Sequence, residues 1–182
     1  VTGAKLNTDV ISAQTALGAT PADTDELLVS DAGVLKRVDY SYLKSVNTPA
    51  FRVNKSSTQS IPGDSETELT WQDEILDTDN AFASNRFTPQ TAGYYQIYAS
   101  ARFNSNDDAD QWRMQIHKNG SQFAIGSTVT RTQQTAQCLA FVELNGSSDY
   151  VSAYAYHNLG SGKNVEAQDT YTYFQGFKLI GV

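Results

Sequence analysis

The sequence predicts an all-β sandwich over residues 49–182, preceded by a small module over residues 1–48. Short strand-like runs follow one another after residue 48 with turn signals between them, which is typical of sandwiches. All eight Phe, both Trp and eight of the ten Tyr also lie after residue 48. The preceding segment has no Phe, Trp or Cys, and Pro49 marks the expected boundary.

Residues 26–39 of the first module have the pattern of a β-hairpin. The runs LLVS and VLKRV flank Asp31-Ala32-Gly33, which we expect to form a three-residue turn with Gly33 at the position that needs a positive φ. Asp39 is the expected N-cap of a short helix over residues 39–45. A unit of this size buries too little apolar surface to be stable alone, so we expect it to need neighbours.

The second module contains a series of strand-like runs and no segment with a helical period. Asn119-Gly120 lies between two of these runs and is the strongest short hairpin signal in the chain. Asn145-Gly146 marks a second, slightly longer turn. The expected strands lie within residues 50–56, 67–71, 86–89, 93–104, 111–118, 121–131, 136–144, 149–158 and 171–182.

Several of these runs carry large side chains on both faces. In residues 94–103, one face has Tyr94 and Tyr98, and the other has Ile97 and Phe103. The run 150–156 also has a Tyr-rich face, and the last run is apolar on both faces to its end. Surfaces rich in Tyr are favoured at protein interfaces. We therefore expect the domain to associate with copies of itself.

Composition and motif content exclude several classes of function. A net charge of −7 argues against a nucleic-acid partner, because phosphate binding needs clustered Lys and Arg. No apolar run is long enough to cross a membrane. Cys138 is interpreted as a buried inert thiol, and His117 and His157 lack the spacing of metal ligands. Without a nucleotide-binding or hydrolase motif, we expect no enzyme activity and no cofactor.

Two pairs of acidic residues admit a catalytic interpretation. Glu66 with Glu68, and Asp73 with Glu74, could supply the acid and base of a glycosidase. Nothing in the sequence establishes their separation in space or a cleft beside them. Catalysis is therefore the disfavoured interpretation.

The loop NSNDDAD, residues 104–110, is dense in the oxygen ligands that Ca²⁺ prefers. Asp107, Asp108 and Asp110 could hold this ion together with neighbouring Asn side chains. The loop lacks the central Gly and terminal Glu of an EF-hand loop. We interpret these charges as solvated, with Ca²⁺ as the less favoured alternative.

Four motifs in the second module resemble the C1q branch of the C1q/TNF-like jelly-roll family. They are FTPQTAGYYQI at residues 87–97, IHKNG at residues 116–120, Leu144 with the DYV of residues 149–151, and FQGFKL at residues 174–179. Ile97 replaces an aromatic residue of the family pattern, and Ser148 replaces a Gly. The resemblance implies a jelly-roll sandwich that assembles as a homotrimer. It also implies that the last strand lies centrally in one sheet, with its second face towards neighbouring subunits.

The first module resembles a different group of proteins. Its segment PADTDELLVSDAGVLKRVDYSYL, residues 21–43, is similar to a segment that recurs in bacteriophage tail-fibre proteins. No collagen-like repeat is visible in the sequence. The resemblance implies a fibre stem or attachment module that binds other virion fibre or tail proteins. Since the chain begins at Val1 rather than Met, we interpret it as a fragment or a processed chain.

Alternation of strand direction places the loops of the sandwich at two ends. Both termini are expected at one end, the base. The loops 104–110, 131–135 and 158–170 are expected at the other end, with segment 56–66 as an optional member of this group. Polar loops on a rigid scaffold are where binding residues concentrate, and their Asn, Gln and Asp side chains suit sugar hydroxyls. The candidate receptor-binding residues are Asn104, Asp107, Asp108, Asp110, Arg131, Gln133, Gln134, Asn158, Lys163, Asn164 and Asp169.

The functional hypothesis is a virion fibre protein of a bacteriophage, located on a tail or head fibre and outside the cell. Its trimeric knob would bind a host-surface glycan or protein during adsorption, with avidity multiplying weak contacts. The alternative is a purely structural trimerisation cap or a capsid or tail decoration protein that binds no ligand. Binding to host cells discriminates the two hypotheses.

Overall fold

The computed structural model of the chain describes residues 13–104, 111–126 and 135–181. The chain divides into two compact units, Val1–Ser45 and Val46–Val182. Both are built from antiparallel β-strands, and no α-helix occurs in the described residues. Within those residues no helix is long and apolar enough to cross a membrane.

The first unit contains the expected hairpin, formed by β1 (Glu26–Asp31) and β2 (Val34–Asp39). The expected three-residue turn is wrong, because Asp31 pairs with Val34 and leaves only Ala32 and Gly33 in the loop. Both have positive φ, 49° and 85°, which matches the twist of the flanking strands in a two-residue hairpin.

The short helix expected over residues 39–45 is present only as three residues of 3-10 helix, and its expected N-cap is wrong. A single 3-10 turn, η2 (Tyr40–Tyr42), follows β2, and the Asp39 side chain makes no capping hydrogen bond. Asp39 instead remains extended and pairs with Glu26 as the last residue of β2. The backbone N–H of Tyr40 then donates to the carbonyl of Asp25 at 2.7 Å, which ends the hairpin.

No described residue of the first unit is buried. Leu28 is 67% exposed and Val34 is 59% exposed. Exposed ion pairs, Lys36 with Asp31 and Arg37 with Glu26, lie across the two strands. Because an isolated two-stranded hairpin is marginally stable in water, these aliphatic side chains need a partner surface.

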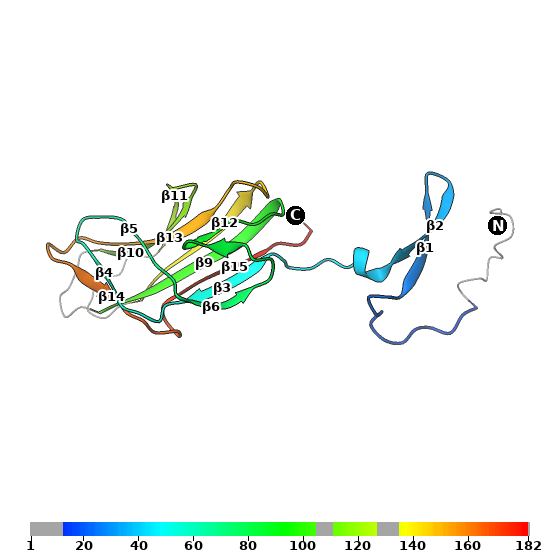
Figure 1. Cartoon of the computed structure of the whole chain (residues 1–182), viewed down its shortest axis with the longest axis horizontal. Helices are drawn as coiled ribbons and strands as arrows, with labels where there is room; N and C mark the ends of the chain where they lie inside the picture. Colours follow the sequence, from blue (N-terminus) through cyan, green and yellow to red (C-terminus); the bar gives the residue numbers. More distant parts are fainter. Residues whose placement is uncertain (1–12, 105–110, 127–134, 182) are drawn as a thin grey trace. The chain divides into compact units, whose positions relative to one another are not determined.

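The second unit is a sandwich of two sheets, which we name the β9 sheet and the β13 sheet after their central strands (Figure 1). The β9 sheet runs in the order β12 (Thr135–Leu144), β9 (Gly93–Asn104), β15 (Tyr173–Lys178), β3 (Ala50–Asn54) and β6 (Asp73–Asp77), with β14 (Lys163–Val165) and β4 (Gln59–Ile61) added beside the end of β9. The β13 sheet runs β11 (Ser121–Ile125), β10 (Trp112–Lys118), β13 (Val151–His157), β8 (Arg86–Phe87) and β7 (Phe82–Ala83), and β5 (Thr67–Glu68) also pairs with β13.

The core lies between these sheets and is formed by alternate side chains of the long strands. An aromatic cluster fills one part, with ring centroids 4.3 Å apart for Phe51 and Phe87 and 4.9 Å apart for Phe51 and Phe174. Gly176 is required beside it, because a Cβ there would lie 2.6 Å from Cδ1 of Ile97 and 2.9 Å from a ring carbon of Phe51. Burial of the apolar surface at about 25 cal/mol per Å² is the main stabilising contribution.

The last strand lies centrally, as the family motifs imply. β15 is hydrogen-bonded to β3 on one side and to β9 on the other, and the three strands lie side by side in Figure 1. Phe174 points into the core and is fully buried, whereas Tyr173 and Phe177 lie on the outward face. Both faces of the strand are therefore occupied by aromatic rings.

The strand register also places the loops at two ends. Phe177 pairs with Ala50 at the base, near both ends of the unit. At the other end, which we call the apex, Asn104 pairs with Asn164, and Trp112 pairs with His157. The segment 56–66 belongs to this end, because Ile61 of β4 pairs with Lys163.

Candidate functional site

The apex brings together some of the sequence-predicted residues. Asn104 at the end of β9 is exposed and lies opposite Asn164 of β14, next to Lys163. Asn158 follows β13, and its Oδ1 accepts a hydrogen bond from the backbone N–H of Gln111 at 3.1 Å. These four predicted residues come from three separate segments, and β-pairing and loop contacts hold them at one end.

Segment 62–64 is packed tightly against the same end. The backbone N–H of Asp64 donates to the carbonyl of His157 at 2.8 Å, and the Tyr156 hydroxyl donates to Asp64 Oδ1 at 3.3 Å. A Cβ at Gly63 would lie 1.7 Å from the carbonyl oxygen of Leu159, so only glycine permits this approach. The described part of the apex is thus a polar surface held by backbone and side-chain contacts.

Asp169 does not join this group. Its carbonyl oxygen accepts a hydrogen bond from Arg52 Nη2 at 3.4 Å, and the neighbouring Gln168 accepts one from Arg102 Nη1 at 3.2 Å. Both arginines lie on the outward face of the β9 sheet. Asp169 therefore belongs to that face.

The remaining predicted binding residues, and with them the Ca²⁺ alternative, lie outside the described residues. In the part of the chain that is described, no group of three or more His, Cys, Asp or Glu side chains could hold a metal ion. The predicted residues in question are Asp107, Asp108, Asp110, Arg131, Gln133 and Gln134.

The outward face of the β9 sheet, which we call the open face, carries exposed apolar side chains. Phe141 is 59% exposed and Leu139 is 51% exposed, both on β12, and Tyr94 on β9 is 43% exposed. A hollow of about 200 Å³ lies on the same face between Leu76 and Phe177. A surface of this composition is suited to contact with another protein surface.

Stacked aromatic and guanidinium groups cover the other part of the open face. The rings of Tyr98 and Tyr173 are stacked with centroids 5.6 Å apart, and the guanidinium of Arg52 lies 4.4 Å from the Tyr173 ring. Nη1 of Arg52 also donates to Gln175 Oε1 at 2.9 Å. Burial and the hydrogen bond with Tyr173 raise the pKa of Tyr98 to about 12, so its hydroxyl stays neutral at physiological pH.

The outward face of the β13 sheet, which we call the covered face, is different. Gln115 and His117 point outward from β10 yet are 0% and 4% exposed. Nε2 of Gln115 donates to Glu66 Oε1 at 3.0 Å, and the His117 ring stacks on Tyr154 with centroids 3.8 Å apart. Desolvation lowers the pKa of His117, against the opposing effect of the Glu66 carboxylate.

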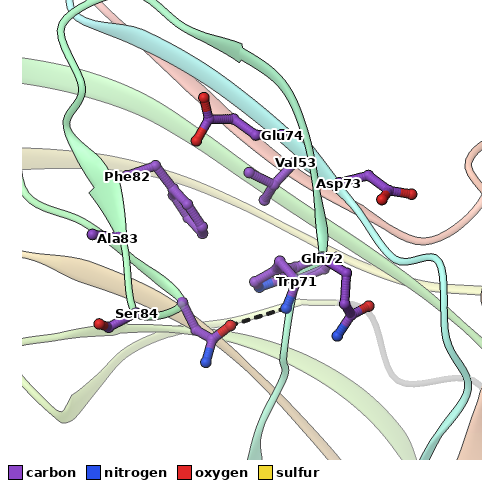
Figure 2. Close-up of a pocket in the computed structure, with 9 residues that line it drawn as sticks. Val53, Trp71, Gln72, Asp73, Glu74, Phe82, Ala83 and Ser84 are labelled. Carbon is purple, nitrogen blue, oxygen red and sulfur yellow. Dashed lines mark hydrogen bonds between the residues drawn. The ribbon is translucent and has the colours of Figure 1, made fainter.

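The two acidic pairs considered for catalysis lie at different places. Glu66 and Glu68 belong to the covered face, where Glu68 lies 3.6 Å from Arg86. Asp73 and Glu74 line a pocket of about 280 Å³ at the edge of the sandwich, between β6 and the β7–β8 hairpin (Figure 2).

Sequence reasoning missed this pocket, because its walls come from three separate segments. Figure 2 shows Phe82 and Val53 pointing into it beside Trp71, with Glu74 above them. Oδ1 of Asn85 accepts a hydrogen bond from the backbone N–H of Trp71 at 2.9 Å. This bond connects the β7–β8 hairpin to the segment between β5 and β6. An aromatic floor with polar groups at its rim can bind a small ligand.

Two buried reactive groups are structural. The Cys138 thiol is buried as the sequence predicts, and burial raises its pKa to about 11. Lys55, which sequence reasoning missed, is fully buried, and desolvation lowers its pKa to about 8. Its ammonium donates to Gln59 Oε1 and to the carbonyl of Thr70, both at 2.8 Å. Lys55 thereby connects the end of β3 to β4 and to the segment between β5 and β6.

No model of a known protein family matches the sequence, and no curated protein matches it. Solved structures do match. Murine APRIL at pH 5.0 is similar at 14% identity with a TM-score of 0.54, covering 71% of this chain and 98% of the APRIL chain. The globular domain of the zebrafish complement 1qA protein is similar at 17% identity with a TM-score of 0.54, covering 72% and 98%. The chain therefore contains a C1q/TNF-like jelly roll, which confirms the fold that the sequence motifs imply.

Proposed function

We propose that this chain is a bacteriophage fibre protein whose knob, Val46–Val182, forms a homotrimer and binds a host cell-surface receptor during adsorption. The observation that carries the proposal is the apex, a polar end of a C1q/TNF-like jelly roll that lies opposite the paired residues Ala50 and Phe177 at the base of the unit. The resemblance of residues 21–43 to phage tail-fibre segments supports the location on a virion, outside the host cell.

The open face supports the trimeric part of the proposal. Phe141, Leu139 and Tyr94 are large, exposed and grouped on one sheet, and a second copy of the chain covers them in the trimer. The edge of the sandwich beside this face adds Phe123 and Ile125 of β11, each 48% exposed. A closed threefold arrangement buries such a surface on every subunit, so no copy of it remains exposed.

The apex supports the binding part. Asn104, Asn158, Lys163 and Asn164 lie together at the apex of the knob, so three copies present three equivalent polar surfaces. Directional amide and ammonium groups suit glycan hydroxyls or polar protein surfaces. Weak contacts at three equivalent sites reinforce one another through effective concentration.

The first unit supplies the attachment. Its hairpin exposes Leu28, Val34 and Leu35, which need a partner surface, and other virion fibre or tail proteins provide it. The alternative function is a structural trimerisation cap or decoration protein that uses the same open face and binds no receptor.

Staining of cells tests the proposal against this alternative. Fluorescent full-length chain is incubated with a panel of bacterial strains, beside a double variant, Lys163→Ala with Asn164→Ala, and a control, Gln90→Ala, at an exposed residue near the base. We expect staining of susceptible strains that the double variant loses and the control keeps. Staining of no strain by a chain of trimeric mass would favour the structural cap.

A further inference from the structure

We propose that the pocket between β6 and the β7–β8 hairpin is a binding site for a pyranose residue without acidic groups, carried by a surface glycan. The inference rests on the proposed function and adds, away from the apex, a second contact of the same knob with the host-surface glycan. The pocket lies at the edge of the sandwich formed by β6 and β7. The exposed Phe141 and Ile125, which belong to the proposed trimer surface, lie at the other edge, formed by β12 and β11.

The floor of the pocket is apolar and held rigidly by the core. Val53 is 1% exposed and Trp71 is 9% exposed, and the Trp71 ring stacks on Phe174 with centroids 5.9 Å apart. Phe82, which Figure 2 shows projecting into the pocket, stacks on Phe51 at 5.3 Å. Rigid aromatic groups match the C–H face of a sugar ring and lose little conformational entropy on binding.

The rim supplies both kinds of hydrogen-bonding group that sugar hydroxyls require. Asp73 and Glu74 offer carboxylate acceptors. Asn85 offers a donor, because its Oδ1 is engaged by the backbone N–H of Trp71 and its Nδ2 is the remaining end of the amide. Ser84 adds a hydroxyl that can donate or accept.

The hairpin that carries these groups has an unusual backbone. Ser84 and Asn85 both have positive φ, 51° and 64°, and neither is glycine. This conformation is one that residues other than glycine rarely adopt, and the hydrogen bond with Trp71 helps to maintain it at Asn85. It brings the Asn85 amide to the pocket rim.

Charge and size restrict the ligand. The lining contains two carboxylates and no Lys or Arg, so an acidic sugar such as a uronate would be repelled. A volume of about 280 Å³ is just below the usual range for ligand sites and suits one ring rather than a chain.

The test uses the full chain and saturation-transfer NMR with six methyl pyranosides, namely those of glucose, galactose, mannose, fucose, N-acetylglucosamine and glucuronate, each at about 10 mM. The site variants are Glu74→Gln, which keeps the shape and removes the charge, and Asn85→Asp, which keeps Oδ1 and removes the donor. Glu26→Gln in the first unit is the matched control. Circular dichroism verifies that each variant is folded.

We expect saturation transfer to at least one uncharged pyranoside and none to the glucuronate. Both site variants should weaken binding about tenfold, because Glu74→Gln removes a charged acceptor and Asn85→Asp replaces the amide donor by a carboxylate, and the control should not. Absence of transfer to every uncharged pyranoside overturns the inference, and so does binding that both site variants retain.

The failure of this inference is distinguishable from failure of the proposed function. If cells are stained and staining survives Glu74→Gln but is lost with Lys163→Ala and Asn164→Ala, the receptor binds at the apex and the pocket inference is wrong. If neither cells nor sugars are bound, both proposals fail and the structural cap remains.

Discussion

On the open face, Phe141 and Leu139 are more than half exposed, whereas on the covered face Gln115 and His117 are almost completely buried. The two faces belong to the two sheets of one sandwich and differ in how their outward side chains are covered. Polar outward side chains are covered by the chain's own Glu66 and Tyr154, and apolar outward side chains are left uncovered. The covered face is therefore complete within one chain, and the proposed trimer assigns the cover of the open face to a second copy.

Hydrogen bonding explains why the polar face is the one that the chain covers itself. Buried polar groups must find specific partners, and Gln115 has Glu66 on one side and His117 Nε2, 2.9 Å from its Oε1, on the other. Apolar groups need only exclusion of water, which any complementary surface provides. A second protein surface can therefore cover the open face without specific hydrogen-bond partners.

The largest expected effect comes from placing a charge on the open face. Phe141→Asp should reduce the solution mass from three times 19.9 kDa to 19.9 kDa, because each interface loses an aromatic anchor, at a cost of about 2 kcal/mol or more, and gains an unpaired carboxylate. Light scattering behind a sizing column measures the mass. Ser65→Asp, an exposed position beside the covered face, should leave the mass unchanged. A trimeric Phe141→Asp chain would place the interface elsewhere.

The second effect concerns the covered face. Gln115→Met keeps the volume but leaves the Glu66 and His117 atoms without their partner, so the free energy of unfolding should fall by about 1–3 kcal/mol. Gln122→Met at an exposed position of β11 should change it by less than about 0.5 kcal/mol. Urea denaturation at one protein concentration measures both, and the oligomeric mass should not change. A neutral Gln115→Met would mean that the cluster contributes nothing to stability.

Much of this organisation is readable from the sequence, and the limits have a physical cause. The Asn119-Gly120 turn and the runs that became β9, β10, β12, β13 and β15 follow from local alternation and turn chemistry. The strands β4, β6, β7 and β14 were missed. β6 reads DEILD, with acidic residues at an edge, and β4, β7 and β14 are two or three residues long, too short for a period.

The candidate site was predictable only in part for the same reason. Alternation along β10 assigns Gln115 and His117 to an outward face, but their cover comes from Glu66, 49 residues away from Gln115. The pocket likewise combines Val53, Trp71 and Phe82 through the closing of the sandwich edge. Strand parity, in contrast, is sufficient to place Asn104, Asn158, Lys163 and Asn164 at one end.

A smaller effect uses one stacking interaction on each face. The guanidinium of Arg52 lies 4.4 Å from the Tyr173 ring on the open face, and that of Arg113 lies 4.9 Å from the Tyr156 ring on the covered face. Arg52→Met and Arg113→Met should each reduce the free energy of unfolding by about 0.5–1 kcal/mol. Only Arg52→Met should increase the dissociation of the trimer, measured as mass against dilution. Equal dissociation of both variants would show that the open face is not the assembly surface.

The smallest effect is a pH dependence that belongs to the covered face. Desolvation is the main cause that lowers the pKa of His117, so the unfolded chain takes up a proton before the folded one as the pH falls below about 6.5. The free energy of unfolding should therefore be highest above that pH and decrease as the pH falls towards the lowered folded pKa of His117.

His157, whose pKa burial also lowers, contributes with the same sign, so His117→Gln should reduce the slope of stability against pH without removing it. Urea midpoints at pH 7.5, 6.5 and 5.5 for the parent chain, His117→Gln and His157→Gln measure the two contributions. If His117→Gln leaves the slope unchanged, the Glu66 carboxylate 3.8 Å from Nε2 compensates the desolvation completely, and the covered face is insensitive to acid.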